Sequence, residues 1–449
     1  MLKRSFAIVI VFCALCPNHV RGEWDTYQGN ASHTGYVPGS FQPSNFSLQW
    51  DQNLPAQNLQ GMAVGDGNVY AVSGQLGTPG GVNTLFAINQ QRGLLSWQAG
   101  FPAAPSFGFV FSVNAPAYSN GTVFVQTSDN YDYGYKQDFT RLYALNATNG
   151  QQAFFTNLSS QWETYLSPTP YNGQLYMDGG TYGGMYSINS SSGTQNWFAN
   201  LPQYDAWTPA VNATYCYSQT GPEFSAINRV TGAQVFGLEV PNYPFGSYSM
   251  NSSPVLGTNN DAITIINGGP LYPTGTIGGR LISWNIQSDG THTPHIAWTD
   301  TDGFSGQSTL ANNVIYAIDN GLLTAIDEGS GDVLWNWNAG SALSGPIVAT
   351  DNELFVSGSN DTYAVDISTH QADWSAPYAG QLALSDGSLY IATADGQVVA
   401  YTLVPEPGLA TLVTSCGLGL LARRRRSSRL PKTAERFVLR QTTLAKEHP

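Results

Sequence analysis

Apolar and polar residues alternate along much of the chain, and one alternating stretch recurs with a fixed spacing. Each copy ends on Asn or Asp, which is followed four residues later by Gly and eight residues later by Trp or Phe. The five complete copies are residues 85–89 with Gly93 and Trp97, 142–146 with Gly150 and Phe154, 185–189 with Gly193 and Trp197, 224–228 with Gly232 and Phe236, and 323–327 with Gly331 and Trp335. Alternation is the period of a β-strand, and Asn, Asp and Gly are turn residues, so each copy predicts a hairpin.

The fixed Gly and the fixed aromatic of each copy have separate physical roles. We expect the Gly to lie where the turn needs a positive φ, which a residue without Cβ adopts at little cost. We expect the aromatic ring to anchor one sheet against the next, because a single ring buries a large apolar area.

Two degraded copies and one half-copy extend the series. The degraded copies are residues 362–366, which lead to Trp374 with His370 in the Gly position, and residues 281–285, which have one extra residue before Gly290 and an aromatic displaced to Trp298. The half-copy at residues 398–402 has no aromatic after it, and residues 46–50, which end on Trp50, could supply the missing strand from the other end of the chain.

Further short strands precede each copy, which makes four strands in roughly 40–50 residues, the size of a propeller blade. The series therefore predicts an all-β, eight-bladed β-propeller of four-stranded antiparallel blades over residues 23–403. Seven blades are complete in sequence. We expect the eighth to close by pairing of the N-terminal and C-terminal strands, which removes a free sheet edge.

The repeated stretch resembles the repeat of the pyrroloquinoline-quinone (PQQ)-type propellers, whose blades contain a Tyr-Ala-Leu-Asp…Gly…Trp docking motif. The opening residues Trp24-Asp25, Gly29-Asn30 and His33-Thr34-Gly35 resemble the beginning of that superfamily. The resemblance implies the fold but leaves the activity open, because the superfamily includes quinone-dependent dehydrogenases, an outer-membrane assembly lipoprotein and non-enzymatic binding proteins.

The first 22 residues have the pattern of a secretory signal peptide. Lys3 and Arg4 are followed by an apolar run over residues 6–15, which is too short to span a bilayer. Cleavage after the segment 20–22 would leave the propeller as an exported domain.

Residues 404–426 resemble the bacterial PEP-C-terminal sorting signal. Pro405-Glu406-Pro407 is followed by an apolar, Gly-rich stretch and then by four arginines at 423–426. The resemblance implies recognition by sorting machinery, temporary anchoring in the membrane, and then display at the cell surface or in the extracellular matrix of a bacterium. The alternative, a C-terminal helix packed on the propeller, suits Pro-Glu-Pro and adjacent arginines poorly. We expect the basic tail at 427–449 to be disordered.

Charge and cysteine content narrow the classes of partner. Between residues 23 and 404 the chain has five basic and 27 acidic residues, so nucleic acid is excluded as a partner because phosphate binding needs clustered cations. The same region contains a single cysteine, Cys216, which rules out a disulfide within the domain and which we expect to be buried.

Catalytic patterns are weak. The quinone-dependent dehydrogenases that the repeat resembles have adjacent cysteines near the quinone and a Glu-Asn-Asp calcium set, and the propeller region has no adjacent cysteines. We therefore predict no catalytic residue, no metal and no cofactor. A PQQ-dependent oxidoreductase with calcium, or another propeller enzyme, is the alternative.

Aromatic residues gather in the segments that lead into the first strand of successive blades. In a propeller these segments cross one face and converge on the mouth of the central channel, where rings suit sugars or a partner's loop. The candidate ligand-binding residues are Phe111, Trp162, Tyr165, Tyr204, Trp207 and Tyr248. Alternatively, these rings wedge between blades. The sequence thus predicts an exported binding or scaffold propeller whose ligand is a glycan or an envelope or matrix protein.

Overall fold

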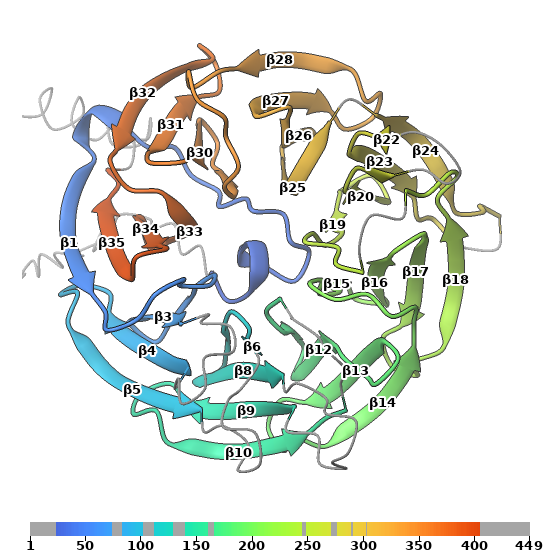
Figure 1. Ribbon diagram of the computed structural model, residues 1–449, viewed down its shortest axis with the longest axis horizontal. Helices are drawn as coiled ribbons and strands as arrows, with labels where there is room; N and C mark the ends of the chain where they lie inside the picture. The colour runs from blue at the N-terminus through green and yellow to red at the C-terminus, as the bar shows by residue number, and fades with distance from the viewer. Residues whose placement is uncertain are drawn as a thin grey trace, which may run out of the picture. The chain divides into compact units, whose positions relative to one another are not determined.

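The described part of the computed structural model is a ring of four-stranded antiparallel sheets around a central channel (Figure 1). The structure describes residues 24–73, 83–101, 112–128, 140–159, 166–244, 248–270, 276–288, 291–301 and 303–404. The predicted eight-bladed β-propeller is confirmed. The predicted signal peptide, the sorting segment after Val404 and the basic tail lie outside the described residues. Among the described residues, no helix is long and apolar enough to cross a membrane.

Blades 1 to 4 each run from a short inner strand beside the channel to an outer strand on the rim. Blade 1 contains β2 (Ala63–Gly65), β3 (Asn68–Val72), β4 (Asn83–Asn89) and β5 (Leu95–Phe101). Blade 2 contains β7 (Ala117–Ser119), β8 (Thr122–Ser128), β9 (Arg141–Asn146) and β10 (Gln152–Asn157), with β6 (Ser112–Val113) also paired to β8. Blade 3 contains β11 (Thr169–Tyr171), β12 (Gln174–Asp178), β13 (Gly184–Asn189) and β14 (Gln195–Asn200), and blade 4 contains β15 (Ala210–Val211), β16 (Tyr215–Thr220), β17 (Glu223–Asn228) and β18 (Gln234–Glu239).

Blades 5 to 8 repeat this order, except that the last blade takes its outer strand from the start of the chain. Blade 5 contains β19 (Val255–Leu256), β20 (Asp261–Ile266), β23 (Arg280–Asn285) and β24 (His295–Asp300), with a small hairpin of β21 (Gly269–Pro270) and β22 (Thr276–Ile277). Blade 6 contains β25 (Phe304–Ala311), β26 (Val314–Asp319), β27 (Leu322–Asp327) and β28 (Val333–Trp337). Blade 7 contains β29 (Ile347–Ala349), β30 (Glu353–Ser357), β31 (Thr362–Asp366) and β32 (Gln371–Ala376), and blade 8 contains β33 (Gly380–Ser385), β34 (Ser388–Thr393), β35 (Gln397–Thr402) and β1 (Ser47–Asn53).

Pairing of the two ends of the domain closes the ring, as the sequence predicts. Strand β1 runs antiparallel to β35, with Ser47 opposite Thr402 and Asn53 opposite Gln397, and the two strands lie side by side in Figure 1. The blades are stabilised by burial of their middle strands. All five residues of β3 and all six of β20 are buried, whereas the outer strand β18 alternates between exposed and half-buried positions.

Neighbouring blades are joined through the fixed spacing of the repeat: the aromatic of one blade lies over the Gly of the next. The ring of Trp197 in blade 3 lies 2.7 Å from where a Cβ on Gly232 of blade 4 would stand, and its indole N–H donates to the carbonyl of Arg229 at 3.0 Å. Equivalent joints are Trp50 on Gly93, Trp97 on Gly150, Phe154 on Gly193 and Trp298 on Gly331. These glycines have φ between +67° and +79°, so both expected roles of the repeat are confirmed.

Each turn is shaped by the Asn or Asp that ends the repeated stretch. The Asn89 side-chain carbonyl accepts the backbone N–H groups of Gln91 and Arg92, and Asp327 does the same for Gly329 and Ser330. Such side-chain turns explain why these two residue types recur at this position. Cys216 in β16 is buried, as expected, and burial raises the pKa of its thiol.

Candidate binding site at the channel mouth

Residues 24–37, called the N-terminal segment below, cross the central channel, where the blue helical turn η1 (Tyr27–Gly29) is visible in Figure 1. Its carbonyl groups accept backbone N–H groups from the inner strands of six blades. The pairs are Val64 to Trp24 and Tyr118 to Asp25 at 2.7 Å, Val211 to Ala31 at 2.7 Å, Leu256 to Ser32 at 2.9 Å, and Leu310 to Thr34 and Ala349 to Gly35 at 2.8 Å. The N-terminal segment therefore occupies the centre of the ring, where residues 24 and 26–28 line the mouth.

His33 fixes this segment at the middle of the channel. It is fully buried, with Nδ1 3.2 Å from the carbonyl of Pro254 and Nε2 3.1 Å from the hydroxyl of Thr169. Burial lowers the pKa of His33 to about 3, against which the bond to Pro254 acts weakly. The imidazole is neutral near pH 7, so Nδ1–H donates to Pro254 and Nε2 accepts from Thr169.

Hydrogen bonds connect the inner ends of blades 3 to 6 beside the segment. Thr208 donates its hydroxyl to the carbonyl of Ser167 at 2.7 Å and its N–H to the Ser253 hydroxyl at 3.0 Å. The side chain of Gln307 accepts the N–H of Ser253 at 2.7 Å and donates to its carbonyl at 3.1 Å. These buried polar side chains have partners within the protein, so they hold neighbouring blades in position around the mouth.

A pocket of about 440 Å³ opens at this mouth. Its lining comprises residues 24 and 26–28 of the N-terminal segment, residues 61–62, 115, 167 and 251 ahead of inner strands, and residues 306–307, 344–346, 357–359 and 379–382 of blades 6 to 8. Several of these positions, such as Gly61, Ser167 and Ser344, lie in the links between blades, which are the segments where the sequence predicts the site.

The described lining residues are uncharged. Exposed polar side chains come from Asn251, Ser344, Ser359 and Gln381, and they add amide and hydroxyl groups to backbone from several glycines. Trp24 and Tyr27 contribute aromatic surface, and the Tyr27 hydroxyl donates to Gln307 at 3.2 Å. Because the described lining contains no Asp, Glu, His, Lys or Arg, it offers hydrogen-bonding groups without a proton-transfer or anion-binding group.

The structure describes three of the six predicted ligand-binding residues, and it brings these three together away from the pocket. Phe111, Trp162 and Tyr165 lie outside the described residues. Trp207 is fully buried and donates its indole N–H to the carbonyl of Tyr204 at 3.0 Å, so its ring belongs to the core together with that of Tyr204, which is 7% exposed.

Tyr248 is the exposed member of this group, with 63% of its surface accessible and its ring centroid 5.7 Å from that of Tyr204. These three described residues are not among the residues that line the pocket. The rings that do line it, Trp24 and Tyr27, belong to the opening motif, whose course across the channel the sequence did not reveal.

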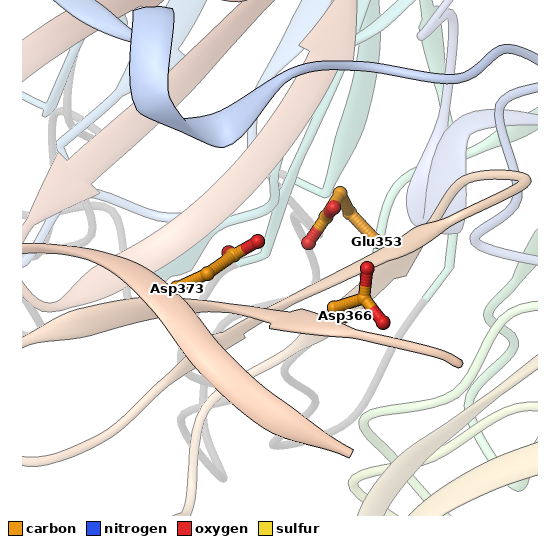
Figure 2. Close-up of side chains that lie close together, drawn as sticks. All are labelled: Glu353, Asp366 and Asp373. Atoms are coloured by element: carbon orange, nitrogen blue, oxygen red, sulfur yellow. The ribbon is translucent and has the colours of Figure 1, made fainter. Parts of the chain in front are cut away.

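A second group of polar side chains lies in blade 7, where Figure 2 shows Glu353, Asp366 and Asp373 close together. One carboxylate oxygen from each lies within 4.8 Å of the others, a set that could hold a metal ion. Burial and the charge of Asp366 raise the pKa of Asp373, while hydrogen bonds from Ser368 and Thr369 outweigh burial and lower the pKa of Asp366.

Sequence reasoning missed this group because its members come from three strands. Glu353 and Asp366 become cross-strand partners only when the hairpin of β30 and β31 is aligned. Glu353 begins β30, whereas Ser357 at the other end of that strand lines the pocket, so the carboxylates lie at the opposite end of the blade.

Eight four-stranded blades, closed by the two chain ends and joined by an aromatic on a glycine, define a PQQ-like propeller. The chain belongs to the family described as outer membrane protein assembly factor BamB, whose model matches residues 111–337 and 319–404. Membership of this family agrees with the resemblance in the repeated stretch.

Solved structures share the fold at low sequence identity. BamB from Moraxella catarrhalis is 14% identical with a TM-score of 0.58, and 80% of this chain covers 97% of it. A europium-containing methanol dehydrogenase is 11% identical with a TM-score of 0.62, and 85% of this chain covers 98% of it. One fold thus accommodates an assembly factor and a dehydrogenase, and the likeness alone assigns neither role.

Tetrathionate hydrolase from Acidithiobacillus ferrooxidans is a curated relative. It is 22% identical over an alignment of 318 residues, and the match covers 64% of this chain and 60% of the hydrolase. The chain therefore spans about 60% of the length of this relative.

Proposed function

We propose that this protein is an exported, non-enzymatic binding propeller whose channel-mouth pocket takes a neutral glycan. The observation that supports the proposal is the lining: amides, hydroxyls and backbone groups beside the rings of Trp24 and Tyr27, with no carboxylate, imidazole or cation among the described lining residues. Sugars present hydroxyl groups at their edges and C–H groups on their faces, so they match both components of such a wall.

The charges of the domain favour a neutral ligand over an anion. Acidic residues outnumber basic ones by more than five to one between residues 23 and 404, and such an excess repels anions. An anionic substrate, such as the tetrathionate in the name of the curated relative, would need a cation at the pocket. The described arginines, which are Arg92, Arg141, Arg229 and Arg280, do not line it.

A quinone cofactor with calcium also fits the described residues poorly. A calcium ion takes six to eight oxygen ligands, commonly including carboxylates. The described lining supplies no carboxylate. The three carboxylates of blade 7 lie at the other end of their blade. These observations support binding over oxidoreductase chemistry at this mouth.

The cellular location follows from the two chain ends. We infer export by residues 1–22 and transient anchoring by residues 404–426, with sorting machinery that recognises Pro405-Glu406-Pro407. The description of the family as an outer membrane assembly factor supports an envelope location. In this proposal the propeller acts at the cell surface or in the extracellular matrix.

A glycan array with residues 23–404 tests the proposal. Ser359 is exposed and lines the pocket, so Ser359→Trp should fill the pocket and abolish binding. The matched control is Ser375→Trp, an exposed position on the outer strand β32 of the same blade, which should bind normally. Binding that survives Ser359→Trp would place the site elsewhere. A pull-down that captures an envelope protein through the same pocket would replace the glycan by a protein ligand.

A further inference from the structure

Two acidic side chains meet across the joint between blades 5 and 6. Asp261 begins β20 in blade 5, and Glu328 follows the last residue of β27 in blade 6. Asp261 is 8% exposed and Glu328 is 1% exposed. Carboxylates are rarely buried without a partner, so the pair must be stabilised in a particular way.

One oxygen of Glu328 is bound by the turn between β19 and β20, because the side-chain amide of Asn259 donates to Oε2 at 3.2 Å. The second oxygen of Glu328, Oε1, and one oxygen of Asp261, Oδ1, are buried and have no N–H or O–H donor among the described residues. They converge on one point beside Gly257: a Cβ there would lie 2.1 Å from Glu328 Oε1 and 1.9 Å from Asp261 Oδ1.

Two facing carboxylate oxygens that are both charged repel each other strongly in a buried site, whereas a single proton between them makes a hydrogen bond. We infer that Glu328 and Asp261 share a proton across the joint between blades 5 and 6, and that loss of this proton loosens the joint. Burial, reinforced by the charge of Asp261, raises the pKa of Glu328 to about 7, and burial also raises the pKa of Asp261.

The position of the pair connects the proton to blade docking. The backbone carbonyl of Glu328 accepts the indole N–H of Trp298 at 3.0 Å, and the same indole lies over Gly331 in the same turn. A second negative charge on Glu328 pushes this turn away from Asp261, which belongs to the blade that also holds Trp298. The proton therefore stabilises the contact on which the aromatic joint depends.

The strands and the turn next to the pair contain other charged residues. Arg280 on β23, Asp300 on β24 and Asp319 on β26 lie at the ends of their strands away from the pair, whereas His295 on β24 and Asp327 and Asp332 in the turn of Glu328 lie at the nearer end. The carboxylate of Asp327 is bound by the N–H groups of Gly329 and Ser330, and Asp332 is exposed. The guanidinium of Arg280 donates to the carbonyls of Pro241 and Asn242 in the link after β18. The charge that acts on Glu328 is that of Asp261.

Glu328→Gln tests the shared proton because its amide is a permanent donor of the same shape. Urea unfolding of the full chain should be measured from pH 4 to 9 for the wild type, Glu328→Gln and the control Asp332→Asn. Between pH 4.5 and 7 the unfolding constant of the wild type should rise about tenfold per pH unit relative to that of Glu328→Gln. Asp332→Asn should keep the wild-type dependence. Parallel curves for the wild type and Glu328→Gln would overturn the inference.

Two further measurements distinguish a shared proton from a bound cation and guard against a variant that does not fold. Asp261→Asn removes the other charge and should flatten the pH dependence in the same way. This variant replaces Glu328→Gln if the latter does not fold. Unfolding at pH 8 with and without millimolar calcium chloride provides the second measurement. Calcium that stabilises the wild type but not Glu328→Gln would make the pair a cation site and overturn proton sharing, whereas equal effects on both proteins support it.

Discussion

The imidazole of His370 lies flat against the indole of Trp335, with ring centroids 4.5 Å apart and planes inclined by 18°. Trp335 belongs to blade 6 and His370 to the turn of blade 7, at the position that glycine occupies in the other joints described above. His370 also keeps the left-handed backbone of those glycines, with φ +58°. A copy of the repeat that is degraded in sequence thus makes an intact joint by a different contact.

Two substitutions of His370 should separate the contribution of its ring to stability from that of its backbone conformation. His370→Ala loses the stacked ring and retains the strained φ, so it should destabilise the propeller by about 1 kcal/mol. His370→Gly loses the ring but relieves the strain, so its urea midpoint should lie close to that of the wild type. Both variants lack the ring, so a larger loss for Gly than for Ala would mean that rigidity of the turn outweighs relief of the backbone strain.

Gly232→Ala should be among the most destabilising small substitutions in the chain. The new Cβ would lie 2.7 Å from the indole of Trp197 and would occupy a φ of +73°. Strain from the left-handed conformation costs about 1–2 kcal/mol, and displacement of the indole adds about 1–3 kcal/mol.

Gly173→Ala is the matched control for this substitution. Gly173 has φ +74° and nothing within 4 Å of its Cβ position, so its replacement should cost the backbone term alone. The difference between the two midpoints of thermal unfolding then measures the joint itself. Equal losses at both positions would show that the aromatic joint adds no stability.

The stability of the closed propeller should depend on the hydrogen bond of Trp50 as well as on the packing of its indole. The indole N–H donates to the carbonyl of Gln90 at 2.8 Å, and the ring lies over Gly93. Trp50→Phe keeps most of the ring and should cost about 1 kcal/mol, whereas Trp50→Ala should cost about 3 kcal/mol or more. Urea unfolding monitored by circular dichroism compares the two, and equal losses would assign the contribution to the hydrogen bond.

His33 should make the propeller sensitive to acid. Its pKa is about 3 in the folded protein and near 6.5 when exposed, so the unfolded chain binds the extra proton between these values. The stability contributed by neutral His33 is therefore present above pH 6.5 and is lost as the pH falls toward 3, by about 1.4 kcal/mol per unit. His33→Gln should flatten the melting temperature between pH 3 and 6.5, and an unchanged slope would contradict the buried, neutral imidazole.

The fold could be predicted from sequence because its information is local and repeated. Asn89, Gly93 and Trp97 lie within nine residues and recur at the same spacing, so the strand period, the turn and the joint are all visible along the chain. The closing strand could be predicted as well, because the half-copy at 398–402 has no aromatic strand after it and the stretch ending on Trp50 supplies such a strand.

The site was less predictable because its position depends on contacts between distant parts of the chain. Trp24 and Tyr27 reach the mouth only through hydrogen bonds of the N-terminal segment to strands far along the sequence. Trp207 has the composition of a ligand contact, but its N–H is satisfied by Tyr204 three residues earlier, which turns the ring into the core. Composition of a link shows that rings are present and does not show which way they face.

The course of the N-terminal segment also constrains the order in which the protein can fold. Gly35 bonds to Ala349, and Ser47 pairs with Thr402, so residues made first find their partners among those made last. Contacts of such long sequence separation slow folding, because the entropy of a large loop is lost before any contact forms. Blades formed early must wait as an open arc with two unpaired edges, and the channel mouth exists as a site only once the arc has closed.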